Sequence, residues 1–192
     1  IFPDVQISLR PWARCVHETL SLQDMDIAMA LMKTSEREKS FLFSRSYHSL
    51  TPSYLYSSLR YKTPPLQKLA DLVRYKVCSL HGAATFYTKL DASQIESGAT
   101  NYTSLLRKID KAHCDIVVDM REVLQGFFKL ELLPFQSENY TILALPETEK
   151  YPLHFGVSKR HPDSGRLIEK INDAIEQMQK NGSQPAQQQA YF

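Results

Sequence analysis

The sequence predicts an α/β fold, in which β-strands alternate with helices along the chain. Short apolar runs that suit buried strands recur throughout, and stretches with helical apolar spacing separate them. Prolines and glycines stand near the borders between the two kinds of segment. This alternation favours parallel sheets covered by helices. The 192 residues, 43% of them hydrophobic, are enough for one sizeable core or for two small lobes that share a hinge.

Each element follows from the local pattern. Alternating apolar and polar residues predict a strand at 5–9, and Pro11 suits the first turn of a helix that places Trp12 on its apolar face. The run at 26–32 has the composition of a buried parallel strand. Further strands are expected at 41–43, 54–61, 75–80, 94–97, 115–118, 129–133, 140–145 and 153–158. Helices are expected at 64–72, 83–90, 102–112, 121–126 and 164–180.

Composition excludes several classes of function. The net charge is only +2, from 23 basic and 21 acidic residues, and no Lys/Arg run stands out, so we expect no nucleic-acid partner. No apolar run is long enough to span a membrane, so we expect no direct membrane insertion. The chain opens at Ile1 without a signal peptide, as a processed or trimmed chain would.

The three cysteines are Cys15, Cys78 and Cys114. None forms a CxxC pair, and no histidine lies at metal-ligand spacing from them, so we expect no metal site. One disulfide with a free thiol and three buried thiols both remain open, and buried thiols are the usual reading of Cys78 and Cys114 in their apolar surroundings. The cysteines alone do not fix the compartment.

An ordered set of short motifs runs through the chain. Pro11-Trp12-Ala13-Arg14-Cys15 comes first, and the rest follow as Asp26-Ile27-Ala28, Thr34-Ser35-Glu36-Arg37, Phe43-Ser44 with Tyr47, Leu69-Ala70-Asp71-Leu72, Lys76-Val77, Gly82, Cys114-Asp115-Ile116-Val117-Val118-Asp119, Phe155-Gly156-Val157-Ser158-Lys159 and Ile171-Asn172-Asp173-Ala174-Ile175. This order resembles the bacterial periplasmic solute-binding proteins of polar-amino-acid ABC importers, extracellular solute-binding protein family 3, and the resemblance covers nearly the whole chain.

The resemblance implies a two-lobed fold of the type II periplasmic-binding-protein kind. Each lobe is expected to be a sheet covered by helices, and two crossing hinge strands join the lobes. We expect residues 1–58 and 151–192 to form lobe one and residues 59–150 to form lobe two. Members of the family carry an N-terminal strand and helix that have no counterpart in this sequence, so lobe one is expected to be incomplete at its N-terminus.

The same resemblance implies a function. The protein is expected to capture a small amino-acid-like or carboxylate ligand between its lobes, without a cofactor, and to present it to the membrane permease of an ABC importer. It is expected to be a periplasmic monomer, exported through a signal peptide that is not present in this chain. Ligand contacts from both lobes are expected to favour a closed state by hinge closure.

In lobe one, the resemblance assigns ligand contacts to four side chains. Arg37 occupies the position that grips a ligand carboxylate, which a planar guanidinium suits because it donates two parallel hydrogen bonds. Thr34 belongs to the same turn, Trp12 stands where an aromatic side chain stacks on the ligand, and Tyr47 is expected to line the cleft. The alternatives are a surface arginine in the charged turn and core packing for Trp12.

In lobe two, the turn after the strand at 75–80 is expected to touch the carboxylate. Gly82 permits close approach of the backbone, and Ala83, Ala84 and Thr85 follow it at the start of an expected helix whose N–H groups bind anions. Asp119 follows an apolar strand and is expected to pair with a ligand amine. A plain strand–helix turn and a solvated acid are the alternatives.

One departure from the family pattern concerns the ligand. Amino-acid receptors place hydroxyl groups before the Thr34–Arg37 turn and just after the lobe-two glycine. This chain has Ala30, Met32, Ala83 and Ala84 at those places. Fewer side-chain hydrogen bonds then hold the ligand, which favours a larger or more apolar ligand than a standard amino acid.

Two other classes of function remain as alternatives. The same fold serves as the ligand-sensing part of signalling receptors, so a sensing or degenerate module is the first. A dehydratase-like enzyme on this fold is the second. No GxSxG, HExxH or P-loop motif occurs, and the six histidines show no convincing partner spacing, so we expect no catalytic residue and no enzyme.

Overall fold

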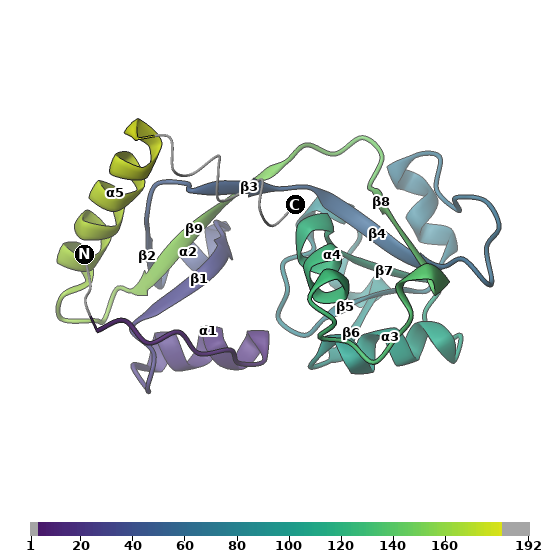
Figure 1. The fold of residues 1–192 in the computed structure, drawn as a ribbon, viewed down its shortest axis with the longest axis horizontal. Helices are drawn as coiled ribbons and strands as arrows, with labels where there is room; N and C mark the ends of the chain where they lie inside the picture. Colours follow the sequence, from purple (N-terminus) through teal and green to yellow (C-terminus); the bar gives the residue numbers. More distant parts are fainter. Residues whose placement is uncertain (1–3, 182–192) are drawn as a thin grey trace. The chain divides into compact units, whose positions relative to one another are not determined.

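The computed structural model describes residues 4–181 and divides into two compact units. Unit 1 comprises Ile1–Ser49 and Pro152–Phe192, and unit 2 comprises Leu50–Tyr151. The chain therefore passes from one unit to the other twice, and each unit has its own sheet (Figure 1). The mixed α/β class predicted from the sequence is confirmed.

Unit 1 is built on a four-stranded sheet within the described residues. Its central strand is β9 (Tyr151–Ser158), which pairs antiparallel with β1 (Ile27–Met32) on one side and with β2 (Phe41–Phe43) on the other. Strand β3 (His48–Leu50) also pairs with β9. The expectation of a parallel strand at 26–32 is wrong, because its partner is the returning strand β9, which runs in the opposite direction.

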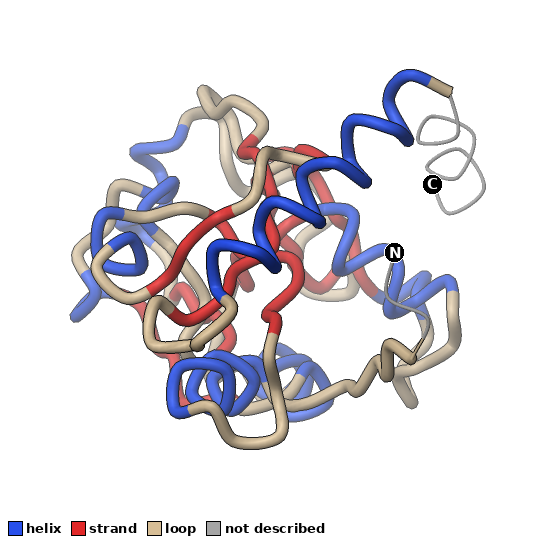
Figure 2. Tube along the Cα trace, turned by 90° about the vertical axis from the view of Figure 1, so that its left-hand side faces the viewer, coloured by secondary structure: helices blue, strands red, loops and turns tan. Residues whose placement is uncertain are grey.

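Helices cover both faces of this sheet. Helix α1 (Trp12–Ser21) packs against Ala28, Leu31 and Phe41, and helix α5 (Ser164–Lys180) packs against Val157. Because Ala28 pairs with Gly156 and its neighbour Ile27 pairs with Val157, the two clusters lie on opposite faces of the sheet. Figure 2 shows α5 as a long regular helix. The third helix is the single turn α2 (Ser35–Glu38).

Glycine is required at 156 by close packing. A Cβ atom there would lie 2.7 Å from a Leu31 methyl carbon and 3.1 Å from the Phe41 ring. Both neighbours belong to the core under α1, where side chains have little room to move. The close packing of β9 against this core therefore explains the glycine in the Phe155-Gly156-Val157 motif.

Unit 2 is built on a five-stranded sheet in the described part of the chain. The strand order is β6 (Ile95–Ala99), β5 (Val77–Leu80), β7 (Ile116–Met120), β4 (Pro52–Ser57) and β8 (Tyr140–Ala144). Strands β6, β5 and β7 are parallel to one another, and β4 is antiparallel to both β7 and β8. Helices α3 (Tyr102–Asp110) and α4 (Arg121–Lys129) contribute to one core with β4, β5 and β7. The short 3₁₀ helices are η1 (Leu69–Arg74), η2 (Phe86–Thr88), η3 (Ala92–Gln94) and η4 (Ser137–Asn139).

The unit boundaries differ from the expected lobe boundaries at one crossing. Residues 50–58, which we placed in lobe one, lie in unit 2, because β4 is hydrogen-bonded to β7 and β8 along its length. The second crossing lies at Tyr151/Pro152, one residue from the expected position. That the two units act as lobes around a hinge stays a prediction.

Two expected strands are wrong. Residues 5–9 form no strand, and the apolar side chains of Val5, Ile7 and Leu9 are 56%, 75% and 88% exposed. Residues 129–133 form the end of α4 and a turn, in which Glu131 adopts a positive φ of 52°. Of the apolar residues there, Leu133 packs on the core of unit 2, while Leu130 and Leu132 are exposed.

Two expected helices are shorter and tighter than predicted. The segment after Pro64-Pro65 becomes η1, and the segment 83–90 contains only the three residues of η2. Both segments are short, and the chain turns there in 3₁₀ geometry, which suits short pieces. No helix among the described residues is long and apolar enough to cross a membrane.

The cysteine pairing that the sequence left open is resolved. Cys78 of β5 and Cys114, just before β7, form a disulfide between residues 36 apart in the sequence, and both are fully buried. Their partner strands are adjacent and parallel, which brings the two sulfur atoms together. Cys15 is a half-buried free thiol.

We predict that loss of this disulfide destabilises unit 2. A bridge that closes a loop of this length removes chain entropy from the unfolded state, which corresponds to about 3–4 kcal/mol. Urea unfolding of the double variant Cys78→Ala/Cys114→Ala is expected to show a lower midpoint than wild type, and a reductant is expected to lower the wild-type midpoint but not that of the variant.

The control for this experiment is Cys15→Ala, which removes the thiol outside the bridge. Its unfolding is expected to respond to the reductant as wild type does. If the reductant leaves the wild-type midpoint unchanged, the disulfide does not stabilise the fold.

Candidate functional site

In unit 1, the predicted contact residues gather around the short helix α2. Thr34 is the N-cap of α2, and its hydroxyl oxygen accepts a hydrogen bond of 3.2 Å from the Arg37 backbone N–H. The Arg37 guanidinium donates to the Met32 carbonyl oxygen at 3.0 Å, which ties the side chain to the end of β1. The local pattern of threonine followed three residues later by arginine is thus a helix cap that fixes the arginine.

Arg37 also lies against the only tryptophan of the chain. The guanidinium carbon is 5.6 Å from the centre of the Trp12 ring, within the range of a cation–π contact. Both side chains are partly buried, and burial lowers the pKa of the Arg37 guanidinium. The structure therefore brings Trp12, Thr34 and Arg37 together, as a fixed planar cation beside an aromatic ring. Such a group can bind a carboxylate by two parallel hydrogen bonds.

Tyr47 has a structural task in the same unit. Its ring centre lies 4.6 Å from that of Phe155, and its side chain packs with the cluster under α5. Its hydroxyl oxygen accepts a hydrogen bond of 3.2 Å from the Ala30 backbone N–H. Burial raises the pKa of the Tyr47 phenol. The cluster under α5 lies on the opposite face of the sheet from the core that Trp12 joins, so Tyr47 is not brought together with Trp12 by the packing.

In unit 2, the predicted residues stand at one edge of the sheet. The parallel strands β6, β5 and β7 end at the same edge, and ligands of open α/β sheets bind at the carboxyl ends of parallel strands. Gly82 lies in the turn after β5 and has a φ of 74°, a conformation that a side chain disfavours. Asp119 lies near the end of β7.

The backbone after Gly82 does not form the expected helix end. Ala83 and Ala84 lie in an irregular connection before η2, and the Ala83 N–H already donates to the Leu80 carbonyl oxygen at 3.0 Å. Thr85 precedes η2, and its carbonyl oxygen accepts bonds from the N–H and the hydroxyl of Thr88. The turn therefore presents a glycine backbone and small half-buried side chains, and the expectation of a helix N-terminus at residue 83 is wrong.

Asp119 is the most unusual ionisable group at this edge. Asp119 is only 9% exposed, and no ion pair among residues 4–181 includes it. Its carboxylate accepts hydrogen bonds of 2.7 Å from the Met120 N–H and 2.7 Å from the Tyr102 hydroxyl. Burial raises the pKa of the Asp119 carboxyl, and these two hydrogen bonds oppose the rise. The alternative of a solvated acid is therefore excluded.

Tyr102 is a residue of this site that sequence reasoning missed. It begins α3, directly after β6, and reaches Asp119 from the neighbouring strand–helix connection. Position was the available signal, because the residue that follows a parallel strand lies at the same edge as Asp119. The residue type gave no signal, because Tyr102 is one of ten tyrosines.

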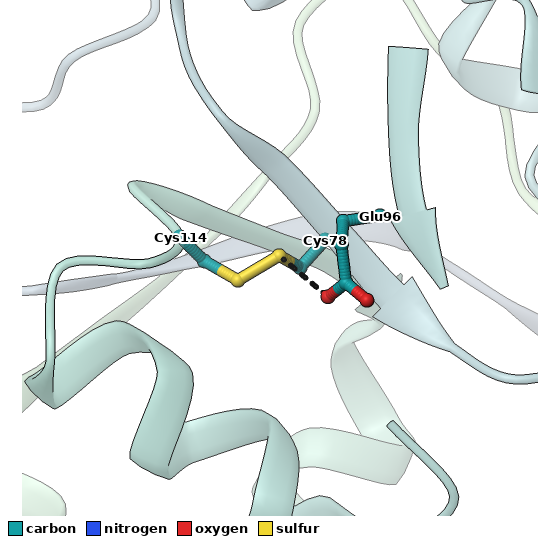
Figure 3. A group of neighbouring side chains, drawn as sticks. All are labelled: Cys78, Glu96 and Cys114. Carbon is teal, nitrogen blue, oxygen red and sulfur yellow. Dashed lines mark hydrogen bonds between the residues drawn. A yellow bond between two sulfur atoms is a disulfide. The ribbon is translucent and has the colours of Figure 1, made fainter. Parts of the chain in front are cut away.

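Three side chains that could ligate a metal meet elsewhere in unit 2. A Glu96 carboxylate oxygen lies 3.4 Å from the sulfur of Cys78, beside the disulfide with Cys114 (Figure 3). The two sulfur atoms are bonded to each other, so neither is a thiolate that a metal requires. Glu96 is also paired with Lys108, which lowers the pKa of its carboxyl. This cluster is therefore part of the disulfide packing of unit 2.

Comparison with solved structures identifies proteins of similar fold. A solved amino-acid ABC transporter substrate-binding protein, AbpA from Streptococcus pneumoniae, bound to L-arginine, superposes with a TM-score of 0.78 at 20% identity, over 97% of this chain and 76% of the other. A substrate-binding protein of the same organism with bound histidine gives a TM-score of 0.73 at 16% identity, over 95% and 74% of the two chains. The ancestral amino-acid-binding protein AncCDT-1, described as a precursor of cyclohexadienyl dehydratase, gives 0.72 at 19% identity, over 97% and 77%. These likenesses show the type II periplasmic-binding-protein fold.

The chain is also similar to part of a longer protein. The chain is 26% identical over 175 residues to a membrane-bound lytic murein transglycosylase F of Pseudomonas fluorescens (strain Pf0-1). The match covers 86% of this chain but only 33% of that relative's length.

The family model of the bacterial extracellular solute-binding proteins, family 3, matches residues 3–192. That match runs through both units and includes every predicted contact residue. The chain therefore belongs to the bacterial extracellular solute-binding proteins of family 3.

Proposed function

We propose that this solute-binding protein captures a small ligand of the amino-acid class, or a related carboxylate, for the permease of an ABC importer. The observation that carries the proposal is the family match over residues 3–192. Two solved proteins of the same fold support the ligand class: one belongs to an amino-acid ABC transporter and is bound to L-arginine, and one belongs to an ABC uptake transporter and has bound histidine. The protein acts by binding, because a ligand that favours one conformation shifts the equilibrium toward it without any chemical step.

Arg37 is the proposed partner of the ligand carboxylate. It is fixed by the Met32 carbonyl oxygen and by the Trp12 ring before any ligand arrives. A pre-positioned guanidinium loses little conformational freedom on binding, so more of the interaction is available as affinity. Trp12 and Thr34 support Arg37 in this proposal, by the ring contact and by the cap of α2.

Asp119 is the proposed partner of the ligand ammonium. A buried carboxylate without a cation is costly in a folded protein, and it persists where function needs it. A ligand ammonium supplies the missing counter-ion. The turn at Gly82, Ala83, Ala84 and Thr85 borders the same edge, and its small side chains leave room for a larger or more apolar ligand.

The disulfide supports an extracytoplasmic location. Disulfides persist in oxidising compartments such as the periplasm and are rare in the bacterial cytosol. The family is extracellular by description, and we propose the periplasm as the compartment. We also propose that the protein acts as a monomer that meets its permease there.

We propose that the chain has no catalytic activity of its own. Its free thiol, Cys15, is half-buried, and burial raises the pKa of that thiol, which makes it a poor nucleophile. A second candidate function comes from the curated relative. The likeness to part of a membrane-bound lytic murein transglycosylase favours a ligand-binding module that acts within a larger protein, in a sensing or regulatory role.

We predict that an amino acid of the right class stabilises the protein and that Arg37 is required. Saturation at about 100 times the Kd adds roughly 2.7 kcal/mol, which raises the melting midpoint by about 5–10 °C in a protein of this size. The measurement is a thermal-shift screen with L-arginine, L-histidine, L-glutamine, L-phenylalanine and succinate. The shift is expected to disappear in Arg37→Ala.

The matched control is Arg160→Ala, which removes an exposed arginine of the same unit. It is expected to keep the full shift. A full shift in Arg37→Ala would exclude the carboxylate role of Arg37. No shift with any compound in wild type would contradict the proposed ligand class and favour the module within a larger protein.

We predict that Asp119→Asn stabilises the ligand-free protein while it weakens binding of an amino acid. The raised pKa of Asp119 means that its protonated form favours the fold, and this contribution is lost as pH rises through the folded-state value. The neutral amide avoids that loss, so the gain in the free energy of unfolding is expected to grow with pH. Chemical unfolding at several pH values tests this, and a variant that is less stable than wild type at neutral pH would refute it.

A further inference from the structure

The carboxylate of Asp119 is held from two sides before a ligand arrives. One oxygen accepts from the Met120 N–H of its own strand end, and the other accepts from the Tyr102 hydroxyl of α3, each at 2.7 Å. The Ser53 hydroxyl of β4 donates to the Asp119 backbone carbonyl oxygen at 2.8 Å, which fixes the strand beneath it. The carboxylate therefore has a defined position at the edge of the sheet.

Tyr102 has little freedom to donate anywhere else. Its ring centre lies 4.2 Å from that of Phe127 in α4, so the ring is held between two helices. Burial raises the pKa of its phenol well above the ordinary value, and the charge of Asp119 raises it further. The hydroxyl therefore stays protonated and acts as a hydrogen-bond donor to the carboxylate.

No ion pair among the described residues includes Asp119, and the ionisable groups on the nearby elements have other partners. Tyr87 of η2 is fully buried, and the charge of Asp119 adds to the rise of its pKa. In α4, the Glu122 carboxylate accepts from the N–H and the hydroxyl of Thr51. Beyond β5, the His81 ring faces the Ser97 carbonyl oxygen at 3.1 Å. Arg121 begins α4, two residues after Asp119 in the sequence, and forms no ion pair in the described part of the chain.

We propose that Tyr102 is a positioning residue, which holds the Asp119 carboxylate in place and in its ionised form so that it binds the ammonium group of the ligand. This inference rests on the proposed function, because it assigns the ligand a positive charge that Asp119 meets. Selectivity for amine-bearing ligands then depends on a pair of side chains, and not on Asp119 alone.

The pair gives binding a specific pH dependence. Ammonium binding requires the ionised carboxylate, so affinity falls as pH falls through the pKa of Asp119. The Tyr102 hydrogen bond lowers that pKa against the effect of burial. Removal of the hydroxyl therefore raises the pKa of Asp119, and the loss of affinity moves to higher pH.

The test compares Tyr102→Phe with Tyr140→Phe. Tyr140 donates to Asp110 at 2.7 Å in the same unit, so the control removes an equivalent tyrosine–aspartate hydrogen bond away from Asp119. Calorimetric titration with L-arginine and L-histidine over a range of pH is expected to show a binding midpoint shifted to higher pH in Tyr102→Phe alone. At the acid end of the range, the Kd is expected to rise by about ten-fold, the effect of one hydrogen bond to a charged group.

A ligand-free measurement separates this inference from the proposed function. The carboxyl carbon signal of Asp119, identified by its absence in Asp119→Asn, is followed by NMR as pH changes. Its titration midpoint is expected to be higher in Tyr102→Phe than in wild type or Tyr140→Phe. An unchanged midpoint overturns the role of Tyr102 whether or not an amino acid binds. A shifted midpoint with no amino-acid binding in wild type overturns the proposed ligand while it retains the positioning of the carboxylate.

Discussion

The constraint on which unit 2 depends is the burial of β7 along its whole length. All five residues of this strand are buried, and β7 lies between β5 and β4 in the sheet. Apolar residues can be buried in this way without loss of free energy, but the burial of the Asp119 carboxylate near the end of the strand costs free energy. Two hydrogen bonds, from Tyr102 and Met120, meet part of the need of its carboxylate. No ion pair supplies a cation within residues 4–181, and for this reason we propose the end of β7 as a place for a ligand.

The two units hold ionisable groups of opposite sign under similar conditions. In unit 1, burial lowers the pKa of Arg37, and in unit 2, burial raises the pKa of Asp119. Each shift acts against the charged form, so each group is less stable as an ion than it would be in water. A bound anion would relieve this cost for Arg37, and a bound cation would relieve it for Asp119.

Much of the fold follows from local sequence pattern, and the failures have physical causes. Helix α5 has the predicted bounds because its apolar spacing is unambiguous. The alternation at residues 5–9 resembles a strand, but alternation creates a strand only where a partner strand is available. The pairing of Cys78 with Cys114 depends on the adjacency of β5 and β7, which spacing along the chain does not encode.

Some residues of the candidate site can be predicted from the sequence, and others can be found only from the structure. Thr34 and Arg37 are recognisable because a cap and its third following residue are neighbours in sequence. Tyr102 and Asp119 are 17 residues apart and meet only because two parallel strands end at one edge. Side chains that act through another residue leave no motif of their own, so geometry is needed to find them. The disulfide ties β5, the strand between β6 and β7, to the segment that leads into β7.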